Sequence, residues 1–440
     1  MTDSARSPAR HLANVGRALR HRNYRLYFAG QGTSVIGTWI TRVATSWLVF
    51  RLTHSALLLG VVTFAGQVPT FLLAPLAGVW VDRLDRYRVL FVTQTLAMLQ
   101  SFALAALALT GVIQAWHIFA LQVFQGVINA FDTPSRQSFL VELVDDRADL
   151  PNAIALNSTM VNGARLIGPA VAGILIAAVG EGWCFLVDGV SYLAVIASLG
   201  MMRLAHGARA SRDTGVWDDL VAGVQYATGM ASMKAILLLL ALMSIAGLPY
   251  GVLMPIIAGD VLHGGAHTYG FLMGATGVGA LVGAIYLASR RTVLGLGRLI
   301  PAATLLFGAA LIAFSFSHSV VLSLMLLFFV GMGFMTQTAA SNTLLQTLVR
   351  PDMRGRVMAF FTMAVMGTTP FGALLAGALA ERIGAPRTIR IGGSLCLLGA
   401  FAFLRALPRL RREIRPIYQE LGILPIVAVN DAAEVEDAVK

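Results

Sequence analysis

The chain has 440 residues, of which 57% are hydrophobic and only 12% are charged, and its mean hydropathy is +0.74. Soluble domains typically carry about 25% charged residues, so this composition excludes an ordinary soluble protein. The formal net charge of +11 is compatible with either nucleic acid or a lipid surface as a partner. The positions of the basic residues along the chain decide between the two.

The first segment, 1–23, is polar and rich in arginine, and it lacks the apolar core of a signal peptide. We expect it to be a cytoplasmic tail. Apolar runs follow that are long enough to cross the ~30 Å hydrocarbon core of a bilayer. Because backbone groups in hydrocarbon have no water to bond, such runs fold as helices. The sequence predicts an all-α polytopic membrane protein with twelve crossings: 24–50, 57–81, 89–111, 116–139, 153–179, 184–203, 233–258, 268–289, 298–317, 320–346, 357–381 and 387–407.

The first crossing carries polar residues at helical spacing on one face, namely Ser34, Thr38, Thr41, Arg42 and Thr45. A charge inside the membrane costs at least ~2.5–3.5 kcal/mol on insertion scales, so this face is expected to turn toward an interior cavity or a partner. Arg42 is a candidate contact for an anionic group of a ligand. Other side chains near the expected cavity are candidates for an adaptable apolar surface: Trp39, Phe64, Tyr250 and Met254.

The second crossing ends in "GVWVDRLDRYRVL", residues 78–90, where a glycine and an aspartate precede a short basic turn. Asp82 can accept hydrogen bonds from the N-terminus of a neighbouring helix, while Arg83 and Arg86 hold the cytoplasmic surface. The fourth crossing carries a polar face at steps of three and four. We expect its last two residues to form a cytoplasmic gate contact; the face consists of Gln122, Gln125, Asn129, Asp132 and Arg136.

The fifth crossing contains "NGARLIGPAVAG", residues 162–173, in which Arg165 lies among apolar and small residues. Pro169 removes one backbone hydrogen bond, and the glycines around it permit close contact with another helix. We expect Arg165 to face the interior and to pair with Asp132 or with Asp188 of the sixth crossing. Two interpretations of this pair stay open. Substrate or a proton competes for the acid, or the pair is a static salt bridge that holds crossings 4, 5 and 6 together. The small residues and proline of this motif are Gly163, Gly168, Pro169 and Gly173.

The longest polar interval, 204–232, separates two predicted six-helix bundles at 24–203 and 233–407. Its stretch "VWDDLVAGVQYATGM" predicts an amphipathic helix along the membrane surface, and a tail at 408–440 begins basic and ends acidic. With 1–23 inside, most of the 33 Lys and Arg residues lie in the cytoplasm, which places both termini there by the positive-inside rule. The arginines lie at helix ends rather than on one patch. They therefore indicate anionic lipid head groups, not nucleic acid, as partners.

The chain also contains an internal repeat. A shift of about 204 residues places Gly163, Gly168 and Gly173 on glycines at 367, 372 and 377. Small residues let helix backbones approach closely in lipid, so such matches preserve packing surfaces. Crossings 4–5 then correspond to 10–11, which predicts two parallel halves with a ligand site between them near mid-membrane.

Two of these motifs resemble those of a known family. Gly78, Asp82, Arg83 and Arg86 match the G-x-x-x-D-R-x-x-R pattern that is motif A of the major facilitator superfamily. The stretch "ARLIGPAVAG" resembles motif C of its drug:proton antiporters. The stretches "FDTPSRQSFLVELV", "LPNAIALNS", "YGFLMGATGVGALVGA" and "MRGRVMA" are similar to the bacterial subfamily that contains the enterobactin exporter and macrolide efflux proteins, and this likeness runs from about Tyr24 to the tail.

The resemblance implies a secondary active transporter in the bacterial inner membrane that exports a small amphiphilic molecule, a drug or a siderophore-like metabolite, by alternating access. It also implies that protons drive the export. The sequence departs from the antiporters at Gln122, where their motif B has an arginine. A proton-coupling scheme that relies on that arginine cannot be transferred to this chain.

Alternatives within transport are an importer or a lipid translocator, and a non-transporting scaffold or receptor is the alternative outside it. No nucleotide loop, nucleophile–base constellation or metal ligand set appears in the sequence, so we expect no enzyme, no cofactor and no metal. His263 and His267 have a helical spacing but lie in a glycine-rich loop. Cys184 and Cys396 lie in apolar runs and are expected to be free, buried thiols. Because all crossings lie in one chain, a monomer is expected.

Overall fold

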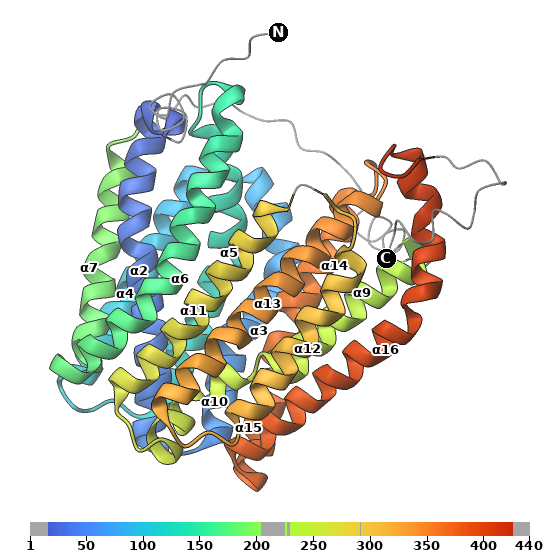
Figure 1. Cartoon of the computed structure of the whole chain (residues 1–440). Helices are drawn as coiled ribbons and strands as arrows, with labels where there is room; N and C mark the ends of the chain where they lie inside the picture. The colour runs from blue at the N-terminus through green and yellow to red at the C-terminus, as the bar shows by residue number, and fades with distance from the viewer. Residues whose placement is uncertain (1–15, 204–224, 227–228, 291, 426–440) are drawn as a thin grey trace, which may run out of the picture.

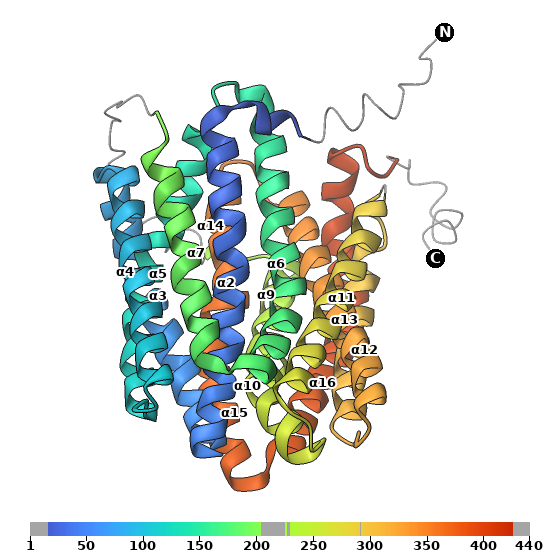
Figure 2. The same ribbon diagram turned by 90° about the vertical axis from the view of Figure 1, so that its left-hand side faces the viewer.

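The structure is a computed structural model, and it describes residues 16–203, 225–226, 229–290 and 292–425, apart from the side chains at 74–75, 78–79 and 82–83. After a short 3-10 turn at Arg17–Arg20, the first half contains six long helices. These are α2 (Arg22–Thr53), α3 (Ala56–Arg83), α4 (Arg86–Leu109), α5 (Ala115–Glu142), α6 (Leu150–Val179) and α7 (Glu181–Gly200). They form the N-bundle, in which α2 lies between α6 and α7 on the face shown in Figure 2.

The second half forms the C-bundle, and two of its six crossings are interrupted. The first of these consists of α9 (Ala231–Leu242) and α10 (Tyr250–Ile256), with π-helical turns at Met243–Gly247 and Ile257–Val261. The other consists of α14 (Arg354–Thr362) and α15 (Thr369–Ile383), joined through a π-helical turn at Met363–Gly367. The continuous crossings are α11 (Ala266–Ser289), α12 (Leu296–Phe314), α13 (Val320–Leu348) and α16 (Ala385–Glu420).

The prediction of twelve crossings in two bundles is confirmed, with two changes to single crossings. We predicted unbroken helices at 233–258 and 357–381, whereas the structure has π-helical turns in both. Pro249 and Pro370 follow two of these turns, and proline cannot donate to the i−4 carbonyl, so the ladder of hydrogen bonds shifts there. Ten helical segments of the described chain are long and apolar enough to cross a membrane. The other two crossings, α2 and α5, carry the polar faces.

The last helix is longer than predicted, since α16 continues beyond residue 407 to Glu420. Three residues of this extension are buried and continue, at steps of three and four, the buried stripe that includes Leu407, while arginines lie on its exposed side. Hydropathy falls after residue 407, but apolar residues continue at helical spacing. This spacing, rather than the mean hydropathy, predicts that the helix continues. The buried residues are Leu407, Leu410, Ile414 and Tyr418. Most of the predicted surface helix at 216–230 lies outside the described residues.

The apolar core shows how the two bundles meet. At the end where α2 begins and α16 ends, here called the terminal end, each bundle has its own core. At the opposite end, a single core joins residues of both bundles, from Phe50 and Ile176 to Tyr269 and Phe314. The bundles therefore pack together at the opposite end and have separate interiors at the terminal end (Figure 1).

Candidate transport pathway between the bundles

Two pairs of glycines bring the bundles together at the opposite end. On one side of the molecule, a Cβ added to Gly60 of α3 would lie 2.6 Å from the carbonyl oxygen of Ala373 and 3.1 Å from the Cα of Gly377 in α15. On the other side, Gly173 of α6 meets Gly270 of α11 in the same way. Because Gly173 and Gly377 are equivalent positions of the internal repeat, the two contacts are related by the pseudosymmetry that the sequence predicted.

Polar contacts strengthen the same closure. The carboxylate of Glu381 in α15 accepts hydrogen bonds from the hydroxyl of Ser55 and the backbone N–H of Leu57, both at 3.0 Å. These groups lie at the N-terminus of α3, where unpaired N–H groups favour a negative charge. Trp47 of α2 stacks on Tyr269 of α11 across the same interface. Sequence reasoning missed Glu381, because nothing in its own helix indicates a partner in the other bundle.

Two arginines of the N-bundle lie in the interior. Arg42 of α2 remains accessible to water although protein surrounds it, and its guanidinium lies 4.6 Å from the ring centre of Trp39. Arg165 of α6 is half-buried and lies 6.0 Å from the ring centre of Phe334 in the C-bundle. The two guanidinium groups are near enough to repel each other. Arg165 therefore faces the interior, as the sequence predicted.

The predicted partner of Arg165 is not where we expected it. Asp132 forms an ion pair with Arg136 of its own helix, and it accepts hydrogen bonds from Thr93 at 3.0 Å and Gln94 at 2.6 Å, both in α4. Within the described chain, no carboxylate pairs with Arg165 in this conformation. Asp132 and Arg136 connect α5 to α4 inside the N-bundle, and they do not reach the C-bundle.

Asp188 of α7 is buried and has no cationic partner among the residues described. One carboxylate oxygen accepts a hydrogen bond from Ser101 of α4 at 2.9 Å. The other oxygen faces α2, where a Cβ added to Gly37 would lie 2.6 Å away. Thr41 of α2 is near enough to interact with the carboxylate, although neither its hydroxyl nor that second oxygen makes a hydrogen bond of ordinary length. Asp188 is thus a buried acid with spare hydrogen-bonding capacity.

The motif at residues 78–86 is only partly described. The side chains of Gly78, Asp82 and Arg83 lie outside the described ones, although their backbone completes α3. Arg86 forms an ion pair of 2.7 Å with Glu142 of α5, inside the N-bundle. The turn itself consists of Leu84 and Asp85, and the carboxylate of Asp85 caps α4 by accepting from the backbone of Tyr87.

The glycines of the fifth crossing have different surroundings. A Cβ added to Gly168 would lie 2.5 Å from the Cβ of Trp39, so α6 and α2 are in close contact there. A Cβ added to its repeat equivalent, Gly372, would likewise lie 2.5 Å from the carbonyl oxygen of Ile245. Gly163 has open space around it, and α6 continues as one helix through Pro169.

The remaining candidates of the fourth crossing are half-buried. The amide of Gln125 donates to the side chain of Asn129 at 3.1 Å, and Gln122 contacts Gly66 of α3. The first contact lies within α5 and the second joins α5 to α3, so both stay inside the N-bundle.

Among the predicted aromatic and methionine residues, Phe64 keeps some exposed surface, whereas Tyr250 and Met254 are buried. Phe64 is half-buried and meets Phe371 of the C-bundle edge-to-face at 5.8 Å between ring centres. Tyr250 is 7% exposed and lies near Thr276 of α11. Met254 is completely buried in the joined core and has no surface for a ligand in this conformation.

A further ionic cluster lies at the terminal end of the N-bundle. The ring nitrogens of His21 lie 3.2 Å from Asp145 and 3.1 Å from Asp149, and Arg17 forms a second ion pair with Asp149 at 2.9 Å. Burial lowers the pKa of His21, but the hydrogen bonds and charges of Asp149 and Asp145 raise it by more, so that it lies above its ordinary value of 6.5. The two carboxylates thus favour the doubly protonated ring.

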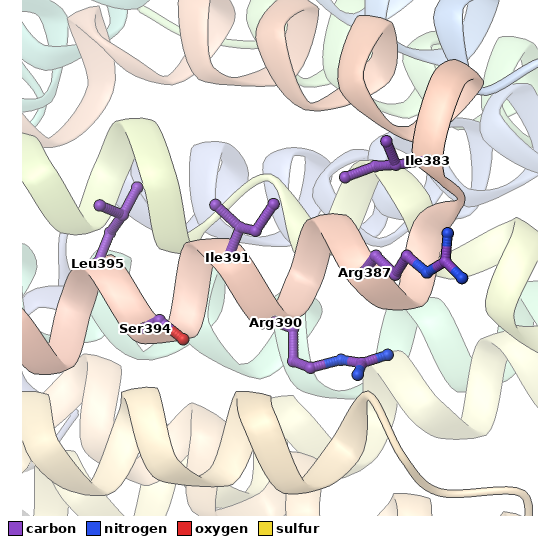
Figure 3. A pocket seen from close by; sticks show the side chains of 6 residues that line it. All are labelled: Ile383, Arg387, Arg390, Ile391, Ser394 and Leu395. Carbon is purple, nitrogen blue, oxygen red and sulfur yellow. The ribbon is translucent and has the colours of Figure 1, made fainter.

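Two hollows lie on the outside of the bundles. One, of about 690 Å³, runs between α2 and α7 and includes Gly37 and Ser191, which both adjoin Asp188. The other, of about 460 Å³, lies on α16 beside Ile383 (Figure 3), and there Arg390 stacks on Phe316 at 4.1 Å while Arg387 extends along the helix.

In the described residues, no group of three or more His, Cys, Asp or Glu could hold a metal ion. Cys184 and Cys396 are free and buried.

Residues 16–417 match a family model described as Transmembrane secretion effector, MFS_3. The chain is 26% identical to the Staphyloferrin A transporter of Staphylococcus aureus (strain NCTC 8325 / PS 47), over 88% of this chain and 97% of that protein. It is 28% identical to the Multidrug efflux pump Tap of Mycolicibacterium fortuitum, over 86% and 94%. It is 22% identical to Macrolide efflux protein A of Streptococcus pyogenes, over 86% and 95%.

Solved structures share the fold. A mutant of the nucleoside transporter NupG superposes with a TM-score of 0.69 at 12% identity, covering 88% of this chain and 99% of that one. A bacterial homolog to the human lysosomal transporter Spinster, in an inward-facing and unoccupied conformation, has a TM-score of 0.65 at 13% identity, over 91% and 98%. The chain therefore belongs to the Transmembrane secretion effector family and is an efflux-like, multi-pass membrane transporter of the major facilitator superfamily, not an enzyme.

Proposed function

We propose that the protein exports a small amphiphilic molecule across the bacterial inner membrane by alternating access, in exchange for protons. The observation that carries the proposal is the core that is joined at one end and split at the other. Two rigid bundles with such a core can close the terminal end only by separating at the opposite end. A site between them is then open to one side of the membrane at a time.

Charge supports the direction in which the site opens. Described arginines at 17–25, 86–88, 350–356 and 405–415 lie at the terminal end, and the positive-inside rule favours this end as the cytoplasmic one. The conformation is then open to the cytoplasm, where an exporter loads its substrate. The names of relatives, which include a multidrug efflux pump and a macrolide efflux protein, support the substrate class of drugs and similar small molecules. All crossings belong to one chain, which supports a monomer.

For proton coupling, Asp188 is the acid that the contacts favour. Asp132 already has a cation and two hydrogen-bond donors, whereas Asp188 has an oxygen without a partner that faces α2. A protonated Asp188 could donate a hydrogen bond to Thr41, next to Arg42 in the same helix. Protonation of Asp188 would then change how α2 packs on α7. That change would move the guanidinium of Arg42 in the pathway. Any exchange of substrate for protons would pass through this contact.

The experiment measures substrate and proton fluxes together in everted vesicles, with a panel of macrolides and siderophores and with or without a pH gradient. Asp188→Asn should uncouple export from proton flux while the protein remains folded, because asparagine still accepts from Ser101. Asp352→Asn, at an exposed ion pair with Arg350, is the matched control. Unchanged coupled export by the Asp188→Asn variant would remove Asp188 from the scheme. In everted vesicles, export moves substrate into the lumen; net movement of substrate out of the lumen would show an importer instead.

A further inference from the structure

The two interior arginines have no counter-charge of their own. The guanidinium groups of Arg42 and Arg165 make no ion pair and no hydrogen bond with any group of the described chain, and each residue lies well inside its helix. A charge in the hydrocarbon of a membrane costs at least ~2.5–3.5 kcal/mol on insertion scales, so two arginines without a partner are expected to face an accessible path, as the exposure of Arg42 indicates. The protein keeps both charges, while Asp132 pairs with Arg136 and Asp188 accepts from Ser101.

Aromatic rings surround these arginines and leave their donor groups available. Trp39 lies 4.6 Å from the guanidinium of Arg42, and Phe334 lies 6.0 Å from that of Arg165. A ring face attracts the cation but accepts few hydrogen bonds, so most of the five N–H donors of each guanidinium stay without an acceptor in the protein. Tyr269 and Tyr250, both in the C-bundle and both buried, lie near Arg42 and Arg165 respectively.

The two bundles thus contribute different chemistry to one site. The N-bundle supplies two positive charges, from α2 and α6, and the C-bundle supplies the half-buried ring of Phe334. A ligand that satisfies both groups has negative charge on one side and an apolar part on the other. Cationic molecules fit poorly, because two uncompensated guanidinium groups would repel them.

We infer that the substrate is an organic anion with at least two carboxylates, held by Arg42 and Arg165 with its apolar part against the half-buried ring of Phe334 in the C-bundle. This inference rests on the proposed function, because it names the substrate class of the same pathway. Arginine pairs with a carboxylate through two parallel hydrogen bonds, so two arginines suit two such groups. Binding also removes the repulsion between the arginines, and the loaded site is then more stable than the empty one.

Binding of citrate to the purified full-length protein in detergent tests the inference, with trimethyl citrate as a neutral control of similar shape. Citrate should raise the melting temperature and bind by calorimetry, and the ester should do neither at equal ionic strength. Arg42→Gln and Arg165→Gln should each weaken citrate binding at least about tenfold. Arg88→Gln, at an arginine whose side chain is 81% exposed, should bind citrate like the unaltered protein. Melting without citrate verifies that each variant is folded.

The outcomes separate this inference from the proposed function. Absence of citrate binding, equal binding of the ester, or full binding by the Arg42→Gln and Arg165→Gln variants would overturn the anion site. Export of a cationic macrolide that both substitutions leave unchanged would also overturn it while the exporter proposal survives. Citrate binding that requires both arginines, in a protein that exports nothing from the panel, would support the anion site and reject the export.

Discussion

Gly173 of α6 and Gly270 of α11 lie backbone against backbone at the closed end of the molecule. A Cβ added to Gly173 would lie 2.8 Å from the Cα of Gly270, and one added to Gly270 would lie 2.7 Å from the Cα of Gly173. Real Cβ atoms do not approach backbone atoms so closely. Both bundles can pack together here only because neither residue has a side chain.

Gly173→Val should therefore force the closed end apart and reduce export. A cysteine in place of Ser46, which lies near Tyr269 across the interface, should become more accessible to a membrane-impermeant thiol reagent in the valine variant. The native thiols are buried and give little background. Gly163→Val is the matched control in the same helix, because nothing lies within 4 Å of its added Cβ. Equal labelling of the two valine variants would contradict the role of the glycine pair.

Glu381→Ala should weaken the same closure more mildly. The substitution removes two hydrogen bonds to the N-terminus of α3, and loss of such a cap typically costs about 1 kcal/mol. Labelling at position 46 should rise severalfold without loss of the folded protein. Arg51→Ala serves as the control, since Arg51 pairs with Glu181 inside the N-bundle and contributes nothing across the interface. A larger effect of Arg51→Ala on labelling would refute this assignment.

Asp132→Asn should destabilise the N-bundle by about 3 kcal/mol, because removal of one partner leaves Arg136 as an uncompensated charge in a largely buried site. The melting temperature of the purified protein measures the loss. The double substitution Asp132→Asn with Arg136→Gln should recover part of it, since no lone charge remains. If the double variant is as unstable as the sum of the single ones, the two residues do not interact.

The cluster around His21 predicts a dependence of stability on pH. The pKa of His21 is raised in the folded protein, so its protonated ring stabilises the fold. This stabilisation is fully present below the unfolded pKa of about 6.5 and is lost as the pH rises through the folded pKa. His21→Gln should lower the melting temperature at pH 5.5 and change it little at pH 9. His318→Gln, at an exposed histidine, should behave like the unaltered protein at both values; an equal loss for His21→Gln at both pH values would contradict the titration.

The sequence by itself determined the helices, their number and their arrangement in two related halves. Burial in hydrocarbon requires long apolar runs, and these can be read residue by residue without knowledge of any contact. The repeat also predicted helix contacts at Gly168 and Gly173, because closely packed helices need small residues at fixed steps, whereas Gly163 has open space around it. The resemblance to exporters rested on contiguous motifs, which can likewise be read from the linear sequence.

Only the tertiary structure decided which charged groups meet. The expected pair of Arg165 with Asp132 or Asp188 is absent from the described residues, since Asp132 turns toward α4 and Arg136, and Asp188 toward Ser101 and α2. A side chain's partner depends on the rotation of its helix and on the neighbouring helix, and a difference of one residue changes its direction by about 100°. The tertiary structure also decided the contact of Glu381 with α3 and the positions of the π-helical turns. They depend on packing between segments that the linear order of residues does not bring together.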